Sequence, residues 1–125
     1  MKALLLIAHG SRKKEANEEI GNLARELADQ DESFDLLEHA FLELAEPSIE
    51  DGVHSLINQG AQEIVVLPYF LAYGAHVGRD IPDAIDALSQ TFTDVSFSIL
   101  SHVGATAGMK RMLLMQIQQA SFRKS

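Results

Sequence analysis

The chain of 125 residues contains no cysteine. This absence excludes a disulfide framework and any metal site built from thiolates, and it fits a reducing compartment. Long apolar runs are also missing, since no stretch approaches the ~20 residues that a membrane span requires. The apolar run after Lys2 leads into a polar segment instead of the small-residue cleavage site of a signal peptide. We therefore expect a cytoplasmic protein with no membrane association.

Positive charge is scarce, because 10 lysine and arginine residues stand against 18 acidic residues and the formal net charge is -8. A nucleic-acid-binding protein needs a basic stripe that displaces counterions from phosphates, whereas the cations here are mostly scattered. We expect no nucleic-acid partner, and any anionic ligand must be held by a few local donors. The composition is that of an ordinary globular chain, and we expect one domain over residues 1–125.

The familiar glycine motifs are absent as well. Neither G-x-G-x-x-G nor G-x-x-x-x-G-K-[ST] occurs, so the sequence offers no nucleotide-binding fingerprint. Ser11 follows a strand-like run, but it lacks the G-x-S-x-G elbow of a serine hydrolase. We therefore expect no nucleophilic role for Ser11.

Four segments have the character of β-strands. Residues 2–8 form a short apolar run that ends abruptly in polar residues, which is typical of a buried central strand. Residues 63–71 form the run with the highest β-propensity and predict a second central strand. Residues 94–100 alternate cleanly, whereas Glu38 and His39 interrupt the alternation of residues 34–42. We expect this last strand to lie at an edge of the sheet.

The segments between and after the strands have helical spacing. Helices are expected over residues 11–30 with Ser11 as the N-cap, from Pro47 to about residue 59, from Asp80 as the cap to about residue 90, and over residues 106–122. Residues 72–80 are expected to form a loop. The methionines of the last helix recur every three residues, which predicts a core or dimer face.

The alternation of strands and helices predicts an α/β fold. Right-handed crossovers then build a four-stranded parallel sheet in the order 2-1-3-4, with helices on both faces, as in a flavodoxin- or Rossmann-like three-layer sandwich. Ligands of such folds bind beyond the carboxyl ends of the strands.

Four side chains suited to metal binding or acid–base chemistry follow the strands at this edge. They are His9, Glu43, His76 and His102. Adjacent strands lie about 5 Å apart, so side chains that follow the first and third strands can converge on one atom. His39 and His54 lie away from this edge, and we interpret both as structural or surface residues. The role of His102 stays open, and so does that of Glu43 as ligand, base or structural acid.

Three segments resemble the short, single-domain sirohydrochlorin chelatases of the cobaltochelatase type. They are Ala8-His9-Gly10-Ser11-Arg12, then Phe41-Leu-Glu43-Leu-Ala-Glu46-Pro47-Ser48, then Leu67-Pro68-Tyr-Phe-Leu-Ala-Tyr-Gly74-Ala-His76-Val-Gly-Arg79-Asp80-Ile81-Pro82. The resemblance covers residues 1 to about 90 in the right order. The final quarter matches less well, because Ser101-His102-Val103 departs from the family's pattern.

This resemblance implies a lyase that inserts a divalent metal into sirohydrochlorin, a polycarboxylate tetrapyrrole, in cobalamin or siroheme biosynthesis. It implies that His9 and His76 are the catalytic pair and the metal ligands, with Glu43 as a supporting carboxylate. Neutral imidazoles can hold an ion weakly and also accept the protons that the macrocycle releases. Co²⁺ is the metal we expect first, while Fe²⁺ and Ni²⁺ stay open, and no organic cofactor is expected.

The resemblance also implies how the substrate is held. Its carboxylates are expected to meet the backbone N–H groups of Gly10 and Ser11 at a helix N-terminus, with Arg12 and Arg79 nearby. Its ring is expected to contact residues at and just beyond the end of the third strand, which are Tyr69, Phe70, Leu71, Tyr73 and Gly74. A tetrapyrrole is large for one edge of such a domain, so a homodimer is expected, with a cleft that holds His9 and His76 from both chains.

Two other classes of function remain as alternatives. A metal or tetrapyrrole carrier would use the same residues without catalysis. A histidine phosphatase is faintly suggested by His9-Gly10 and Ser101-His102, but its chemistry needs an arginine where Ala8 stands.

Overall fold

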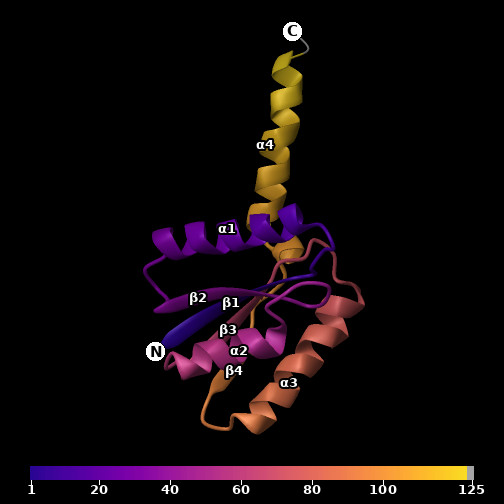
Figure 1. Cartoon of the computed structure of the whole chain (residues 1–125). Coiled ribbons are helices and arrows are strands. Elements are labelled where there is room, and N and C mark those ends of the chain that lie inside the picture. Colours follow the sequence, from indigo (N-terminus) through magenta and orange to yellow (C-terminus); the bar gives the residue numbers. More distant parts are fainter. Residues whose placement is uncertain (124–125) are drawn as a thin grey trace.

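The computed structural model describes the backbone of residues 1–123 and the side chains of residues 1–120. It confirms the predicted α/β fold and the strand order, because all pairings are parallel in the sequence β2-β1-β3-β4 (Figure 1). The strands are β1 (Lys2–Ala8), β2 (Leu36–Phe41), β3 (Glu63–Pro68) and β4 (Ser96–Ile99). β2 lies at the edge, as its interrupted alternation predicts.

β1 is the centre of the sheet. Each of its residues from Ala3 to Ala8 is buried, since β2 and β3 pair with its two sides and helices cover its two faces. Its alternate residues Ala3, Leu5 and Ile7 belong to the main hydrophobic core. A strand buried on both faces reads as a continuous apolar run, which is why residues 2–8 show no alternation.

The helices form two layers around the sheet. α1 (Lys14–Gln30) lies on one face, while α2 (Ile49–Asn58) and α3 (Ile81–Thr91) lie on the other (Figure 1). The fourth helix, α4 (Ala107–Arg123), follows a single 3₁₀ turn, η2 (Val103–Ala105), and leads away from the sandwich. Among the described residues, no helix combines the length and the hydropathy that crossing a bilayer demands.

The start of α1 differs from the prediction. The helix begins at Lys14 with Lys13 at the N-cap, so the prediction of Ser11 as N-cap is wrong. The cause is Asn17, whose side-chain oxygen accepts from the Ser11 N–H at 2.9 Å and whose amide donates to the Ser11 carbonyl at 2.8 Å. These bonds hold residues 11–13 in a turn ahead of the helix.

The segment after β3 also differs from the prediction. The strand ends at Pro68, and the expected loop at residues 72–80 ends in a π-helical turn, η1 (His76–Asp80), that continues into α3. Pro82 lacks the N–H that an α-helix would use here. The N–H of Ile81 instead donates to the carbonyl of His76, which widens the turn. Asp80 therefore does not cap α3 with its side chain.

Gly10 allows the segment after β1 to lie against the segment after β2. Its φ is +99°, and a Cβ at this position would lie 1.8 Å from the carbonyl oxygen of Glu43. The two segments are also joined by the N–H of Glu43, which donates to the carbonyl of His9 at 3.0 Å. Only glycine combines this positive φ with so close an approach.

We therefore expect Gly10→Ala to lower the free energy of unfolding by roughly 1–3 kcal/mol, because the new methyl group must push the two segments apart. Gly108→Ala is the matched control. Gly108 lies in α4 with nothing within 4 Å of the added atom, so we expect no loss of stability there. Urea unfolding followed by circular dichroism measures both variants, and equal midpoints for the two would contradict this reading of Gly10.

Candidate functional site

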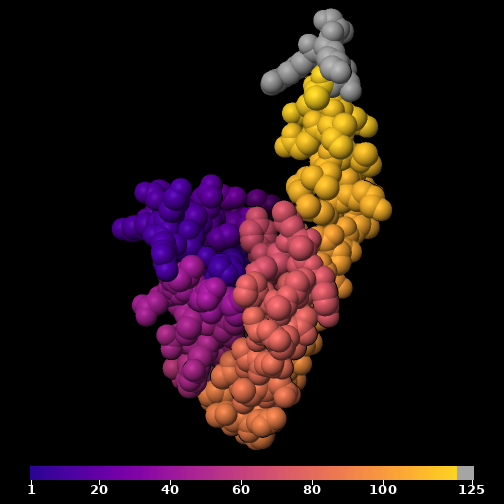
Figure 2. Space-filling model, turned by 90° about the vertical axis from the view of Figure 1, so that its right-hand side faces the viewer, coloured from indigo at the N-terminus to yellow at the C-terminus, as the bar shows by residue number. Residues whose placement is uncertain are grey.

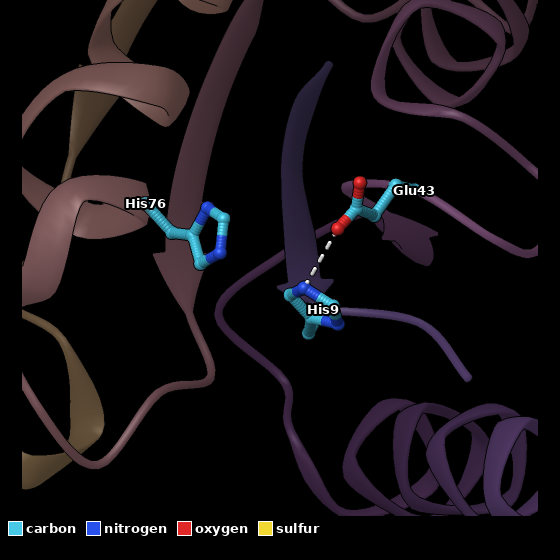
Figure 3. Close-up of side chains that lie close together, drawn as sticks. All are labelled: His9, Glu43 and His76. Carbon is cyan, nitrogen blue, oxygen red and sulfur yellow. Dashed lines mark ion pairs between the residues drawn. The ribbon is translucent and has the colours of Figure 1, made fainter.

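Three side chains from three segments meet beyond the carboxyl end of β1 (Figure 3). His9 directly follows β1, Glu43 lies in the segment after β2, and His76 opens the π-helical turn η1. Each offers one potential ligand atom, and these atoms all lie within 4.8 Å of one another. The sheet edge predicted from the sequence therefore does bring His9, Glu43 and His76 together.

The polar contacts of His9 define where its protons lie. Its Nδ1 lies 2.9 Å from the carbonyl oxygen of Gly10, which can only accept, so Nδ1 carries a hydrogen. Its Nε2 lies 2.9 Å from Oε2 of Glu43. With a hydrogen on Nδ1, Nε2 is the nitrogen that can bind a divalent cation together with Oε2 of Glu43.

His76 is oriented by a carboxylate one turn along its helix. Its Nδ1 lies 2.8 Å from Oδ2 of Asp80, so Nδ1–H donates to this acid and Nε2 is left as the electron-pair donor. The hydrogen bond from His76, with a weaker contribution from Arg79, lowers the pKa of Asp80 and keeps this acid ionised. The imidazole rings of His76 and His9 lie 5.0 Å apart between centroids.

The pairing of His76 with Asp80 is a functional feature that the sequence analysis missed. The signal was present, because residues four apart face each other on a helix. It went unseen because residues 72–80 were interpreted as a loop and Asp80 as a helix cap. The contact of Asn17 with Ser11 was missed as well, because helical spacing alone does not reveal a bond to the turn ahead of the helix.

The site is open to solvent. The side chains of His9, Glu43 and His76 are 42%, 53% and 43% exposed. Two imidazoles and a carboxylate suit a divalent transition-metal ion. Their half-exposed positions leave room for a large ligand to approach the same ion. The arrangement can thus hold a metal ion and pass it on, which a closed structural site does not do.

The aromatic and apolar residues predicted to contact a ligand fall into two groups. Tyr69, Leu71 and Tyr73 are exposed, with Leu71 68% and Tyr73 66% accessible. Phe70 is half-buried against the hydrophobic core, and its ring centroid lies 6.2 Å from that of His76. Gly74 has a φ of +30° and open space around it.

The predicted cationic and backbone contacts are distributed differently from the expectation. Arg79 is exposed and its Nε lies 3.5 Å from Oδ1 of Asp80. Arg12 lines a cavity of about 680 Å³ between α1 and the segment after β2, and none of the three clustered residues lines it. Because α1 begins at Lys14 and the N–H of Ser11 donates to Asn17, Gly10 and Ser11 do not lie at a helix N-terminus as predicted.

The remaining histidines lie outside the cluster. His39 packs between α1 and its own strand, and burial is the main cause that lowers its pKa. His54 stacks edge-on against Phe92 at 5.0 Å. These contacts agree with the structural interpretation of both residues. His102 lies 6.1 Å from the ring of Tyr73, so the predicted gathering of four side chains is reduced to three.

Comparisons with known proteins agree on one family. The CbiX family model matches residues 3–120. A sirohydrochlorin cobaltochelatase of Sulfolobus acidocaldarius is 42% identical, and the alignment covers 71% of this chain and 70% of the relative. A sirohydrochlorin ferrochelatase of Bacillus subtilis is 36% identical, and the alignment covers 82% of this chain and 39% of the relative. The solved chelatase SirB from Bacillus subtilis subspecies spizizenii, in complex with cobalt, superposes with a TM-score of 0.85 at 30% identity and covers 94% of this chain and 50% of that one.

The chain spans only part of the length of these relatives. The aligned parts make up 57% to 70% of three archaeal cobaltochelatases that match at 36% to 42% identity. The ferrochelatase of Bacillus subtilis and SirB are each matched over half of their length or less.

The contact between Asp80 and His76 predicts an effect on metal binding. We expect Asp80→Ala to weaken Co²⁺ binding by roughly 10- to 100-fold, because His76 loses the acceptor that fixes its ring. Asp80→Asn retains an acceptor oxygen and should fall between the wild type and Asp80→Ala. Isothermal titration calorimetry measures all three. Asp86→Ala, an exposed acid further along α3, is the control, and equal affinities for Asp80→Ala and Asp86→Ala would refute the assignment.

Proposed function

Because the chain belongs to the CbiX family, whose model matches residues 3–120, we propose that it is a sirohydrochlorin chelatase. Such a lyase inserts a divalent metal ion into the macrocycle. The observation that carries the proposal is the open cluster of His9, Glu43 and His76, whose ligand atoms lie within 4.8 Å of one another. The names of the relatives at 36% to 42% identity, sirohydrochlorin cobaltochelatase and ferrochelatase, support the choice of substrate.

Metal insertion requires the site to bind the metal ion and to accept protons, and the cluster can do both. Two N–H protons leave the macrocycle as one divalent ion enters, so the reaction conserves charge. His9, Glu43 and Nε2 of His76 would first hold the ion from one side. As the ion moves to the macrocycle, the same atoms become free to take up the departing protons. Oε2 of Glu43 lies 2.9 Å from Nε2 of His9, so the two side chains would share a proton taken from the macrocycle, which assigns Glu43 a role in proton transfer as well as ligation.

We propose Co²⁺ as the metal substrate. The support comes from the archaeal relatives named cobaltochelatases and from the similarity to a chelatase solved with cobalt. Fe²⁺ is the second candidate, because other relatives are named ferrochelatases, and Ni²⁺ suits the same donor set. The insertion needs no organic cofactor. The product would enter the synthesis of cobalamin or siroheme, and we place the enzyme in the cytoplasm.

The macrocycle would lie over the exposed side chains beside the cluster. Tyr69, Leu71 and Tyr73 offer apolar contact, and the half-buried Phe70 supports the position of His76. Arg12 and Arg79 are exposed and can extend to the substrate's carboxylates. Gly10, Ser11 and Gly74 would contribute backbone near the ring, with Gly74 leaving open space for it.

We also propose that the working form is a homodimer. The chain matches half or less of the Bacillus chelatases, and a second copy would supply a comparable surface around a large substrate. In this arrangement each copy contributes its own His9, Glu43 and His76 to a shared cleft.

We expect His9→Ala and His76→Ala each to lower the rate of Co²⁺ insertion by roughly 100-fold or more, because each removes a ligand that also accepts a proton. The change in sirohydrochlorin absorbance on adding Co²⁺ measures the rate against the spontaneous reaction. His54→Ala, which alters a histidine packed on Phe92, is the control and should retain the wild-type rate. Wild-type rates in either site variant would show that the site is misplaced. If the wild-type protein does not accelerate Co²⁺ insertion over the spontaneous reaction, the chain is a metal or tetrapyrrole carrier and not a chelatase.

The metal can be identified by comparing ions. We expect the rate at matched concentrations to be highest with Co²⁺ and lower with Fe²⁺ and Ni²⁺, measured anaerobically in the same assay. A higher rate with Fe²⁺ would reassign the protein as a ferrochelatase without changing the site.

A further inference from the structure

A cavity of about 680 Å³ lies between α1, the edge strand β2 and residues 44–46, which follow β2. We call it the α1–β2 cavity, and its volume is in the range of small-molecule sites in proteins. Figure 2 shows α1, in indigo, next to the magenta part of the chain that follows β2, while α4 stands out from the body of the protein. None of the three clustered residues lines the cavity, so it is separate from the proposed metal ligands.

The floor of the α1–β2 cavity is uncharged and aromatic. Phe41 is buried there, and the ring of His39 meets it edge-on with 5.4 Å between the ring centroids. Gly21 of α1 leaves room for this imidazole, because a Cβ at that position would already lie 3.5 Å from Cε1 of His39. Burial is the main cause that lowers the pKa of His39, and the nearby charge of Arg25 lowers it further, while Glu38 opposes both. A neutral imidazole offers one N–H donor to a bound group.

Positive charge gathers around this floor. All 18 acidic residues of the chain lie between residues 15 and 94, and residues 1–94 contain only six of the ten cations. Three of these six line the cavity and are exposed: Arg12, Lys14 and Arg25. Two acids, Glu18 and Glu46, line it as well, and Glu18 lies 4.0 Å from Lys14. The lining therefore has an excess of positive charge within a strongly acidic part of the chain, which favours an anionic ligand.

The cations are spread along the cavity. Lys14 and Arg25 are separated by three turns of α1, about 16 Å along the helix axis. Lys14 lies at the end of α1 that is close in sequence to His9, whereas Arg25 lies near His39 of β2. A ligand with several acid groups spread over its periphery can use both cations at once, whereas a small acid with one such group is suited to only one of them.

The rim beside the metal cluster has an unusual backbone conformation. Leu44 directly follows Glu43, has a φ of +69° and is 52% exposed. Left-handed backbone is unfavourable for leucine and persists only where the surrounding structure enforces it, and such conformations concentrate at catalytic and binding sites. Because Leu44 also lines the cavity, an apolar side chain stands at its rim, between the cations and the metal cluster. A ligand that contacts the rim thus meets apolar surface before it meets positive charge.

We propose that the α1–β2 cavity binds carboxylate side arms of the macrocycle, with Lys14 and Arg25 holding separate acid groups and Leu44 contacting the ring beside them. A macrocycle centred on the cluster would extend its arms past Ser11 and Leu44, which follow closely after His9 and Glu43 and line the cavity. The proposal rests on the proposed function and deepens it, because it adds a subsite and places Lys14 and Arg25 among the residues that recognise the substrate.

Binding of sirohydrochlorin without metal tests the subsite. We expect Lys14→Gln and Arg25→Gln each to raise the Kd roughly threefold to tenfold, because each removes a charged partner of a carboxylate. Their effects should add in the double variant, since the two positions are far apart. Lys13→Gln is the matched control, because Lys13 carries the same charge next to Lys14 but does not line the cavity. It should stay within about twofold of the wild type in 0.15 M salt. Quenching of sirohydrochlorin fluorescence measures all four variants.

The outcomes separate this proposal from the chelatase activity. A Kd for Lys14→Gln and Arg25→Gln equal to that of Lys13→Gln would overturn the subsite alone. A wild type that binds no sirohydrochlorin would overturn the subsite and the proposed function together. The Co²⁺ affinity of Arg25→Gln, measured by calorimetry, should equal that of the wild type, because no clustered residue lines the cavity.

A free small acid is the other source of carboxylates for this cavity, and the ring signals of His39 in NMR spectra distinguish the two. We expect metal-free sirohydrochlorin to shift these signals and citrate at the same concentration to leave them unchanged, because citrate lacks the contacts of the ring that hold the arms in place. A shift with citrate and none with sirohydrochlorin would assign the cavity to a free acid and overturn the proposal.

Discussion

The backbone pairing at the end of β1 is the constraint on which the site depends. Hydrogen bonds continue past the strand on both sides, from the N–H of Leu42 to the carbonyl of Ala8 and from the N–H of Tyr69 to the carbonyl of Ile7. The next bond on the β2 side joins Glu43 to His9. The segments that carry the functional side chains are therefore held to the sheet before they turn away from it.

Local contacts orient each of the three clustered side chains. Gly10 permits the close approach of the segments after β1 and β2, so that His9 faces Glu43, and Asn17 fixes the turn that follows. Asp80 presents the free nitrogen of His76. The three side chains remain half-exposed, which suits the proposed release of a metal ion. Their positions are thus defined by supporting contacts, while their ligand atoms stay accessible.

The sequence predicts the features that follow from burial, but it does not predict the local structure that depends on single polar contacts. The apolar run of β1 and the interrupted alternation of β2 predict their places in the sheet, and the sheet predicts the meeting of His9 with His76. The start of α1 was misjudged because a side chain, Asn17, replaces the expected cap. The helical turn at His76 was missed because the two glycines, Gly74 and Gly78, indicate a loop. A helix was expected over residues 106–122 with a core or dimer face. Periodicity alone does not indicate whether such a face packs against the sheet of the same chain.

Because the three clustered residues come from separate segments joined only by the sheet, no part of the chain carries the ligand set by itself. An unfolded or partly paired chain offers single imidazoles, which bind a divalent ion weakly. The ion therefore binds the native state more tightly than any incomplete one, and this difference in binding adds to folding stability. Free metal would then act on this protein as a stabilising ligand, and its supply would influence how much of the folded protein persists.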